Sequence, residues 1–277
     1  MSPPAVRTAP APAPATTPDK DLVLPVDDRG FTLGDGLFET LLAVEGRLLN
    51  WEAHIDRLHR GCEALGLPKP APIDCLSVAE DALEAAGPLR RAAVRVNLTA
   101  GSGGRGLDRP DQPGRGLTAG AAPAAEPGRP VRLVISPIRR NEGSPTSRLK
   151  SLAYLDNVLA RREARLRGAD EALMLNNRGE LACAAAANLF WIEGRELFTP
   201  ALDCGVLDGT VRAALLARAA VHEVKAGPEA LLAADALFLT NSLIGLAPVR
   251  SLDGRDVEDH PRLAELSALL ADVVPPA

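Results

Sequence analysis

The chain has 277 residues, a formal net charge of −5 at pH 7 and 46% hydrophobic residues, with aromatic residues at only 3%. This length suffices for one large domain or two of medium size, with largely aliphatic cores. The acidic balance and the lack of a basic cluster argue against nucleic acid as the main partner. No apolar run approaches the roughly 20 residues that span a bilayer, so we expect no membrane association.

Residues 1–20 are rich in Pro and Ala and lack the basic start and apolar core of a signal peptide. We therefore expect a disordered tail and a cytoplasmic location. The four cysteines are widely spaced, with no Cys-x-x-Cys pair and no His at metal-ligand spacing: Cys62, Cys75, Cys183 and Cys204. This pattern is typical of reduced thiols in a cytoplasmic protein and predicts no metal site.

The first half predicts an α+β domain over residues 21–125. Its acidic, glycine-rich run Asp28–Glu39 is typical of a tight turn between strands. Apolar spacing predicts two helices and one strand in the following residues, namely helices over 51–65 and 76–86 and a strand over 92–98. A Gly-rich segment at 101–106 and a Pro/Gly-rich segment up to Pro130 then predict a linker or a functional loop.

The second half, residues 126–277, predicts a domain in which strands and helices follow one another closely. The expected strands are 131–136, 171–175, 188–192, 196–198 and 236–240. The expected helices are 152–166, one that follows Gly205–Arg212 and ends near His222, and one over roughly 261–272.

Lysine is scarce in this chain, since the 31 Lys and Arg residues include only Lys20, Lys69, Lys150 and Lys225. Arginine stays charged, whereas a desolvated lysine can form a Schiff base and transfer protons. Lys150 stands at the entry to the helix expected over 152–166. Most lysines near helix starts are solvated surface groups, so the surroundings of Lys150 must decide whether it is a nucleophile.

Two segments have the composition of an anion site. Gly209-Thr210-Val211 opens a helix, where free N–H groups and the positive end of the dipole suit a phosphate. Thr240-Asn241-Ser242 ends a strand with small polar side chains. Arg57, beside His54 on one helix face, could close such a site with a bidentate contact. Taken singly, each feature is more often an ordinary cap, turn or surface charge.

Several sequence blocks occur in one characteristic order and spacing. They are Asp28-Arg29-Gly30, Gly34 to Thr40, His54 to Leu58, Lys150-Ser151-Leu152, Asn188 to Trp191, Thr199-Pro200, Gly205 to Arg212 and Asn241-Ser242. Together they resemble the fold-type IV pyridoxal-phosphate enzymes, the class IV aminotransferase family, from about Leu24 to Arg250. That family holds branched-chain aminotransferases, D-amino-acid aminotransferases and 4-amino-4-deoxychorismate lyases. Residues 101–106, 187–191 and 241–249 look most like the lyases.

The resemblance implies a two-domain fold that combines α+β and α/β features. A small N-terminal α+β domain would precede a larger C-terminal domain with a mixed, β-barrel-like sheet and helices. The C-terminal domain would bind pyridoxal 5'-phosphate. The resemblance also implies a homodimer that acts on a small molecule, with its substrate pocket near the subunit interface.

The resemblance assigns roles to the matching residues. Lys150 would hold the cofactor as a Schiff base and then move protons. Arg57 would bind the cofactor phosphate, together with the backbone amides of Thr210 and Val211 and the turn at Asn241-Ser242.

On the substrate side of the pocket, Phe38 stands where the aminotransferases often carry Tyr. The family's Arg just before Gly101, which binds a substrate carboxylate, is replaced by Ala100. Arg105, from the glycine-rich loop, would reach the substrate instead.

One further departure concerns the cofactor ring. The family places a glutamate five residues before the Asn of its Asn-Leu-Phe-Trp block, where it pairs with the pyridine nitrogen. Here that position is Cys183, and a neutral thiol is a poor substitute for a carboxylate. Glu180 would lie on the opposite face of a strand and could serve only if a bulge shifted the register.

The first functional hypothesis is a 4-amino-4-deoxychorismate lyase, which releases pyruvate and 4-aminobenzoate for folate synthesis with Lys150 as general base and acid. The runner-up is an aminotransferase for branched-chain or D-amino acids, with an oxo acid such as 2-oxoglutarate as second substrate. A third hypothesis is a catalytically weak homologue that keeps the fold for binding or assembly, as the replacements at 183 and 100 suggest.

Overall fold

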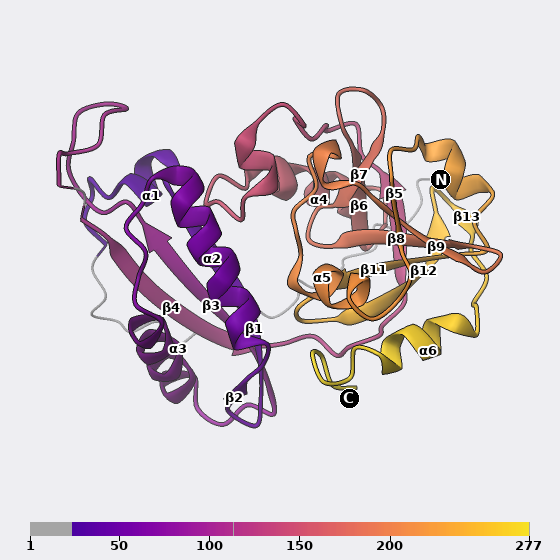
Figure 1. The fold of residues 1–277 in the computed structure, drawn as a ribbon, viewed down its shortest axis with the longest axis horizontal. Helices are drawn as coiled ribbons and strands as arrows, with labels where there is room; N and C mark the ends of the chain where they lie inside the picture. Colours follow the sequence, from indigo (N-terminus) through magenta and orange to yellow (C-terminus); the bar gives the residue numbers. More distant parts are fainter. Residues whose placement is uncertain (1–23, 113, 277) are drawn as a thin grey trace, which may run out of the picture.

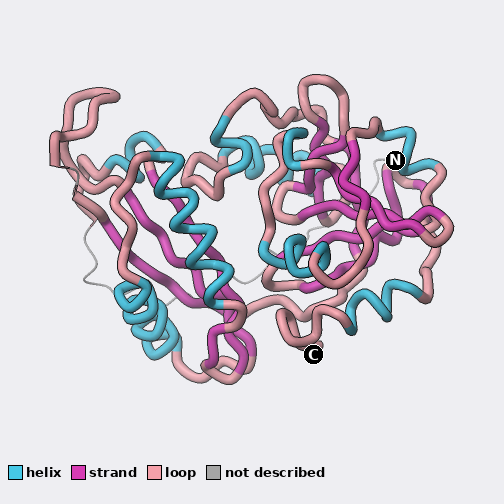
Figure 2. The backbone as a smooth tube through the Cα atoms, in the orientation of Figure 1, coloured by secondary structure: helices cyan, strands magenta, loops and turns pink. Residues whose placement is uncertain are grey.

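The computed structural model describes residues 24–112 and 114–276, so the tail predicted over 1–20 lies outside the described residues. These residues form two sheets that lie side by side (Figure 1 and Figure 2). The first sheet is antiparallel, in the order β2-β1-β3-β4, with β1 (Gly36–Val44), β2 (Arg47–Leu48), β3 (Arg91–Thr99) and β4 (Gly116–Pro123). The predicted combination of an α+β half with a larger mixed half is confirmed.

Strand β1 is buried along most of its length because both of its faces are covered. Successive side chains of a strand point to opposite faces. Leu37 and Leu41 pack in the clusters beneath the helices of the first half. Leu42, from the other face, joins the core of the second sheet. Phe38, on that same face as Leu42, is thereby directed toward the second half of the molecule.

Two helices cover the first sheet, α2 (Trp51–Leu65) and α3 (Pro72–Ala86). The prediction for α2 is confirmed, whereas α3 begins four residues earlier than predicted because Pro72 is suited to the first position of a helix. The prediction of a tight turn over Asp28–Glu39 was wrong. The segment instead holds a short helix, α1 (Arg29–Leu33), which the side chain of Asp28 caps by accepting from the backbone N–H of Phe31 at 3.1 Å.

The Pro/Gly-rich stretch before Pro130 contains a strand, β4, that its composition did not predict. Strand β4 pairs with β3 along its whole length, from Ala92↔Pro123 to Thr99↔Gly116. Its small residues still form the ladder because backbone pairing, rather than side-chain bulk, holds this edge. The connection from β4 to the next strand leads from the first sheet into the second, and the domain boundary predicted at 125/126 falls within it.

The second sheet has nine strands in the order β10-β9-β8-β11-β12-β5-β6-β7, with β13 paired to β12. They are β5 (Val131–Ile135), β6 (Glu171–Leu175), β7 (Leu181–Ala184), β8 (Asn188–Glu193), β9 (Glu196–Pro200), β10 (His222–Val224), β11 (Ala236–Asn241), β12 (Gly245–Leu252) and β13 (Arg255–Asp256). The sheet is mixed, since β5 runs parallel to both β6 and β12 while β8 runs antiparallel to β9 and β11. All five predicted strands are present.

Three α-helices accompany this sheet in the described residues, α4 (Leu155–Leu166), α5 (Thr210–Leu216) and α6 (Arg262–Ala268). The prediction that the helix after Gly205–Arg212 reaches His222 was wrong. It ends at Leu216, and His222 pairs with Phe198 as the start of β10. The apolar periodicity of the segment does not reveal this pairing, which is made with a strand distant in sequence.

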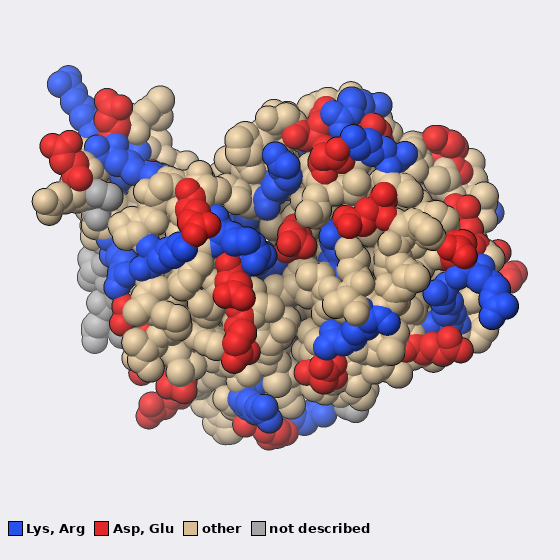
Figure 3. Space-filling view, in the orientation of Figure 1, with Lys and Arg blue, Asp and Glu red and all other residues tan. Residues whose placement is uncertain are grey.

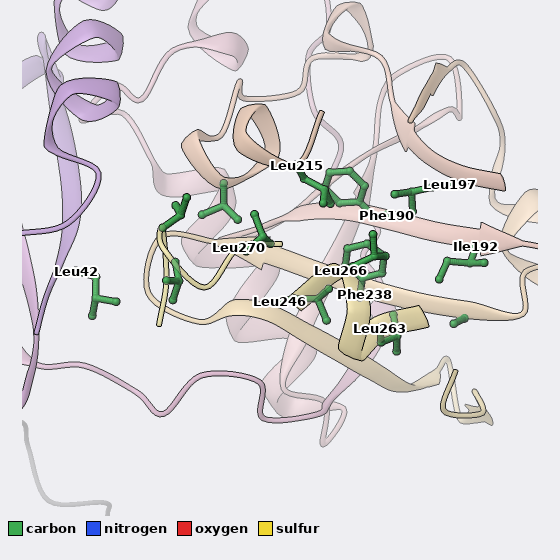
Figure 4. Packing of buried hydrophobic residues seen from close by; sticks show 14 residues of the cluster. Leu42, Phe190, Ile192, Leu197, Leu215, Phe238, Leu246, Leu263, Leu266 and Leu270 are labelled. Atoms are coloured by element: carbon green, nitrogen blue, oxygen red, sulfur yellow. The ribbon is translucent and has the colours of Figure 1, made fainter. Parts of the chain in front are cut away.

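The core of the second half joins both sheets. Phe190 of β8 and Phe238 of β11 stack at 5.1 Å between ring centroids, and Leu263 of α6 lies in the same cluster (Figure 4). Leu42 enters this cluster from β1, so the two halves share apolar contacts. Acidic and basic side chains are interspersed over the face shown in Figure 3. No helix within the described residues is long and apolar enough to cross a membrane.

Candidate active site

Lys150 lies between the two halves, in an extended segment rather than at a helix entry. Its carbonyl accepts from the N–H of Phe38 at 2.8 Å, and the N–H of Leu152 donates to the carbonyl of Gly36 at 2.9 Å. The segment therefore adds to the edge of β1, and α4 begins only at Leu155. This pairing places the Lys150 amine over the ring of Phe38, 4.3 Å from its centroid.

The surroundings of Lys150 favour an uncharged amine. Burial of the side chain, assisted by the positive charges of Arg57 and Arg95, lowers its pKa to about 7, although the charge of Glu39 acts in the opposite direction. At neutral pH a large fraction of the amine is therefore free to attack a carbonyl, which an ordinary surface lysine is not. This environment is the one that a Schiff-base lysine requires.

Arg57 is fixed by a buried cluster on α2 and β1. Its Nε and Nη2 atoms donate to the carboxylate of Glu39 at 2.8 and 2.5 Å, and His54 Nδ1 lies 2.7 Å from the same carboxylate. Burial of Glu39 opposes its ionisation, but the charge and hydrogen bonds of Arg57 outweigh that effect and lower the pKa of Glu39 to about 2. The carboxylate thus stays ionised and orients Arg57.

The predicted phosphate-binding residues come together beside Arg57. Nη1 of Arg57 donates to the carbonyl of Asp208 at 3.1 Å, just before α5, and Thr210 lines the same cavity as Lys150. The Val211 side chain packs into the core, so only its backbone N–H could reach a ligand. The backbone of Gly209 lies so close to the side chain of Asn188 that a Cβ added at Gly209 would overlap Oδ1 of Asn188.

The end of β11 supplies the opposite wall of the cavity. Asn241 and Ser242 both line it, and the Ser242 hydroxyl donates to the carbonyl of Thr40 at 2.7 Å. Thr240 also lines it, and its hydroxyl is buried without a hydrogen-bond partner. A buried hydroxyl without a partner is uncommon and fits a ligand that accepts from it. With Arg57 and the amine of Lys150, these groups fit a phosphorylated carbonyl cofactor.

Cys183 lines the same cavity from β7, with 5% of the residue exposed. Burial raises the pKa of its thiol, so the group is neutral. The ladder between β6 and β7 has an irregularity next to Cys183, but this does not bring Glu180 into the cavity. Glu180 instead accepts from Asn176 at 2.6 Å and from Arg178 at 3.0 Å.

A second cavity adjoins Lys150 on the side of Phe38. Two arginines line it, Arg95 of β3 and Arg161 of α4. The Arg95 guanidinium carbon lies 3.7 Å from the centroid of the Phe38 ring, and Arg161 pairs with Glu171 at 2.9 Å. Phe38 therefore contacts both a lysine amine and a guanidinium, in a cavity that suits an anionic substrate.

Arg105 does not take part in either cavity of this chain. It lies in the exposed loop after β3, where its backbone exchanges hydrogen bonds with Asp108. Arg29 holds this loop by donating to the carbonyls of Leu107 and Asp108 at 2.9 and 3.0 Å. Ala100, at the position of the family arginine, is fully buried.

Sequence reasoning missed four residues that line the cavities: Arg95, Arg140, Tyr154 and Arg161. Tyr154 is the only tyrosine of the chain and stands four residues after Lys150, which was an available signal. Burial raises its pKa to about 12. The arginines gave no such signal, since arginine fills most cationic positions in this sequence.

Comparison with known proteins agrees with this site. Residues 36–252 match the family described as amino-transferase class IV, and the chain therefore belongs to that family. It is thus an enzyme of the pyridoxal-phosphate-dependent aminotransferase and lyase group, as the sequence motifs predicted.

The proteins to which this chain is similar are named for more than one enzymatic activity. The chain is 34% identical over 249 residues to an aminodeoxychorismate lyase of Bacillus subtilis, and this alignment covers 85% of this chain and 83% of the relative. A putative branched-chain-amino-acid aminotransferase of Methanocaldococcus jannaschii is 30% identical over 264 residues, 92% of this chain and 91% of the relative. The structure of a putative 4-amino-4-deoxychorismate lyase from Legionella pneumophila superposes with a TM-score of 0.83 at 31% identity, over 91% of this chain and 96% of that one.

Proposed function

We propose that the protein is a pyridoxal-phosphate-dependent 4-amino-4-deoxychorismate lyase of folate synthesis. The observation that carries the proposal is the pair of guanidinium groups, Arg95 and Arg161, in the cavity beside the Lys150 amine. The substrate carries two carboxylates, one on its ring and one on its enolpyruvyl group. Two arginines around one lysine match that charge distribution.

In the proposed site, Arg57, Thr210, Val211, Thr240, Asn241 and Ser242 hold the cofactor phosphate. Bound pyridoxal phosphate supplies a carbonyl that condenses with amines and a ring that accepts electrons from a neighbouring C–H bond. Lys150 takes the proton from the ring carbon that bears the amine. The C–O bond to the enolpyruvyl group breaks, and a proton returned by Lys150 converts enolpyruvate to pyruvate. The remaining ring is aromatic 4-aminobenzoate, so no second substrate is consumed.

The test is to supply aminodeoxychorismate to the cofactor-loaded protein and to measure 4-aminobenzoate by fluorescence and pyruvate by a coupled dehydrogenase. We expect equal amounts of the two products, with no release by Lys150→Ala. A reaction that needs 2-oxoglutarate and yields glutamate would overturn the proposal.

The second candidate is an aminotransferase for branched-chain or D-amino acids, favoured by the 30% identity with the putative branched-chain enzyme. L-leucine and D-alanine, each supplied with 2-oxoglutarate, test it with glutamate as the measured product. A protein that binds the cofactor but turns over none of these substrates supports the third candidate, a catalytically weak homologue.

We further propose a cytoplasmic homodimer. Apolar side chains are exposed on α1 and α4, with Phe31 at 70%, Leu155 at 66% and Val158 at 57% exposure. Val158 also lines the cavity beside Lys150, so a partner that covered α4 would close that cavity. Light scattering of the purified protein should give twice the chain mass, and Leu155→Glu with Val158→Glu should give the monomer.

A further inference from the structure

The cavity that Lys150 shares with Cys183 and Thr210 has positively charged walls. Among the residues that the structure describes, those lining it include three cationic side chains, Arg57, Arg140 and Lys150, and no Asp or Glu. A bound pyridine ring in this cavity therefore meets no carboxylate on its walls. This matters because a carboxylate next to a pyridine nitrogen stabilises its protonated form, whereas a cation opposes it.

Three glutamates on β1, on β6 and in the turn before β7 have other partners. Glu39 is bound to Arg57 and His54, as described above. Glu171 pairs with Arg161, and Glu180 pairs with Arg178. None of these three carboxylates lines the cavity.

Cys183 and Arg140 form a polar wall of the cavity. Arg140 is 8% exposed and donates to Oδ1 of Asn157 at 3.1 Å and to the carbonyl of Gly205 at 3.3 Å, so its guanidinium is fixed. The thiol of Cys183 is neutral and weakly polar, and it cannot compensate a positive charge. A neutral thiol together with a fixed cation favours an uncharged ring nitrogen.

We propose that Cys183 determines the reaction specificity of this enzyme by leaving the cofactor ring nitrogen without an anionic partner and therefore unprotonated. This inference rests on the cofactor binding proposed above. An unprotonated ring is a weaker electron acceptor, which disfavours transamination of ordinary amino acids. A substrate whose ring becomes aromatic as its C–O bond breaks supplies its own driving force and does not depend on a strong acceptor.

The experiment uses the full chain loaded with pyridoxal phosphate that carries ¹⁵N in its ring, and records the ¹⁵N chemical shift of the bound cofactor at neutral pH. We expect the shift of an unprotonated pyridine. The shift of a pyridinium would overturn the inference, whatever activity the enzyme shows.

A matched pair of variants then tests whether position 183 is responsible. Cys183→Glu and Cys183→Gln have side chains of equal size but different charge. We expect the Glu variant to give the pyridinium shift and the Gln variant to keep that of the unprotonated ring. The Glu variant should also convert the cofactor to its amine form with L-leucine or D-alanine at least about tenfold faster than the Gln variant, since a barrier lowered by the free energy of one pKa unit gives a tenfold faster reaction. Equal ¹⁵N shifts in both variants would show that position 183 does not set the protonation state of the ring nitrogen. If the Glu variant does not fold, the ¹⁵N shift of the unsubstituted protein alone supports or overturns the inference.

The outcomes separate this inference from the proposed lyase activity. An unprotonated ring in a protein that releases no 4-aminobenzoate supports the inference and overturns the lyase. A pyridinium ring in an active lyase overturns the inference and supports the lyase. A protein that binds no cofactor at all overturns both.

Discussion

The carboxylate of Glu39 in β1 accepts from both Nε and Nη2 of Arg57 in α2, at 2.8 and 2.5 Å. This bidentate pair lies in a nearly dry environment, since Glu39 is only 2% exposed. The pair also holds the third nitrogen of Arg57, Nη1, on the carbonyl of Asp208 just before α5. The pair therefore connects the first sheet to the proposed phosphate site in the second half.

Glu39→Gln should destabilise the protein and remove part of its acid sensitivity. The folded-state pKa of Glu39 is about 2, below its ordinary value of 4.5, so its stabilisation is present above pH 4.5 and is lost as the pH falls toward 2. We expect the variant to be less stable at pH 7 by about 3–5 kcal/mol, because Arg57 loses its buried partner. The difference from the unsubstituted protein should shrink below pH 4.5.

Urea unfolding at a series of pH values measures this difference. Glu52→Gln is the control, since Glu52 is an exposed residue of α2, the helix that carries Arg57. It should remain within about 0.5 kcal/mol of the unsubstituted protein at each pH. A difference for Glu39→Gln that does not change between pH 7 and pH 3 would contradict the role given to this carboxylate.

The rate at which Lys150 captures pyridoxal phosphate should rise with pH and level off above its pKa of about 7. The reason is that only the uncharged amine attacks a carbonyl. Borohydride fixes the attached cofactor, so the fraction bound to Lys150 after short times can be measured from pH 5.5 to pH 9. Arg95→Gln removes a positive charge that lowers this pKa, and its profile should therefore move to higher pH. A profile that still rises steeply above pH 9 would show that the amine is not desolvated.

The sequence predicted the elements whose pattern is local, and it predicted the residue types of the cofactor site. Helix α2 and strands β6, β8 and β11 follow from apolar spacing, and the segments holding Lys150, Thr210 and Asn241 were recognised as candidates. Strand β4 was missed because its pairing with β3 depends on a partner distant in sequence. Arg95 and Arg161 were missed for the same reason, since only the fold brings β3 and α4 to one cavity.

Thr240→Val should separate stability from cofactor binding. The Thr240 hydroxyl is buried without a partner, so an apolar group of the same shape should leave stability unchanged or raise it by up to about 1 kcal/mol. If this hydroxyl donates to the cofactor phosphate, its loss should weaken cofactor binding about 10- to 100-fold, since a hydrogen bond to a charged group contributes about 1.5–3 kcal/mol.

Thr199→Val is the matched control for this prediction. The Thr199 hydroxyl is also buried, but it donates to the carbonyl of Leu189 at 2.7 Å. We expect this variant to lose about 1–3 kcal/mol of stability, because the carbonyl loses its donor, with no change in cofactor affinity. Thermal unfolding and fluorescence titration with pyridoxal phosphate measure the two quantities. Equal behaviour of both variants would remove Thr240 from the cofactor site.

Arg95→Gln and Arg161→Gln should each raise the KM for aminodeoxychorismate more than they lower kcat. Each guanidinium is proposed to hold one substrate carboxylate, and loss of one charged hydrogen bond costs about 1.5–3 kcal/mol, or about 10- to 100-fold in affinity. Arg162→Gln, an exposed neighbour of Arg161, is the control and should change neither constant. Arg161 also pairs with Glu171, so thermal unfolding of Arg161→Gln must show that any effect on KM is not a loss of fold. A KM unchanged in both arginine variants would mean that the substrate carboxylates bind elsewhere, and the charge match on which the lyase proposal rests would fail.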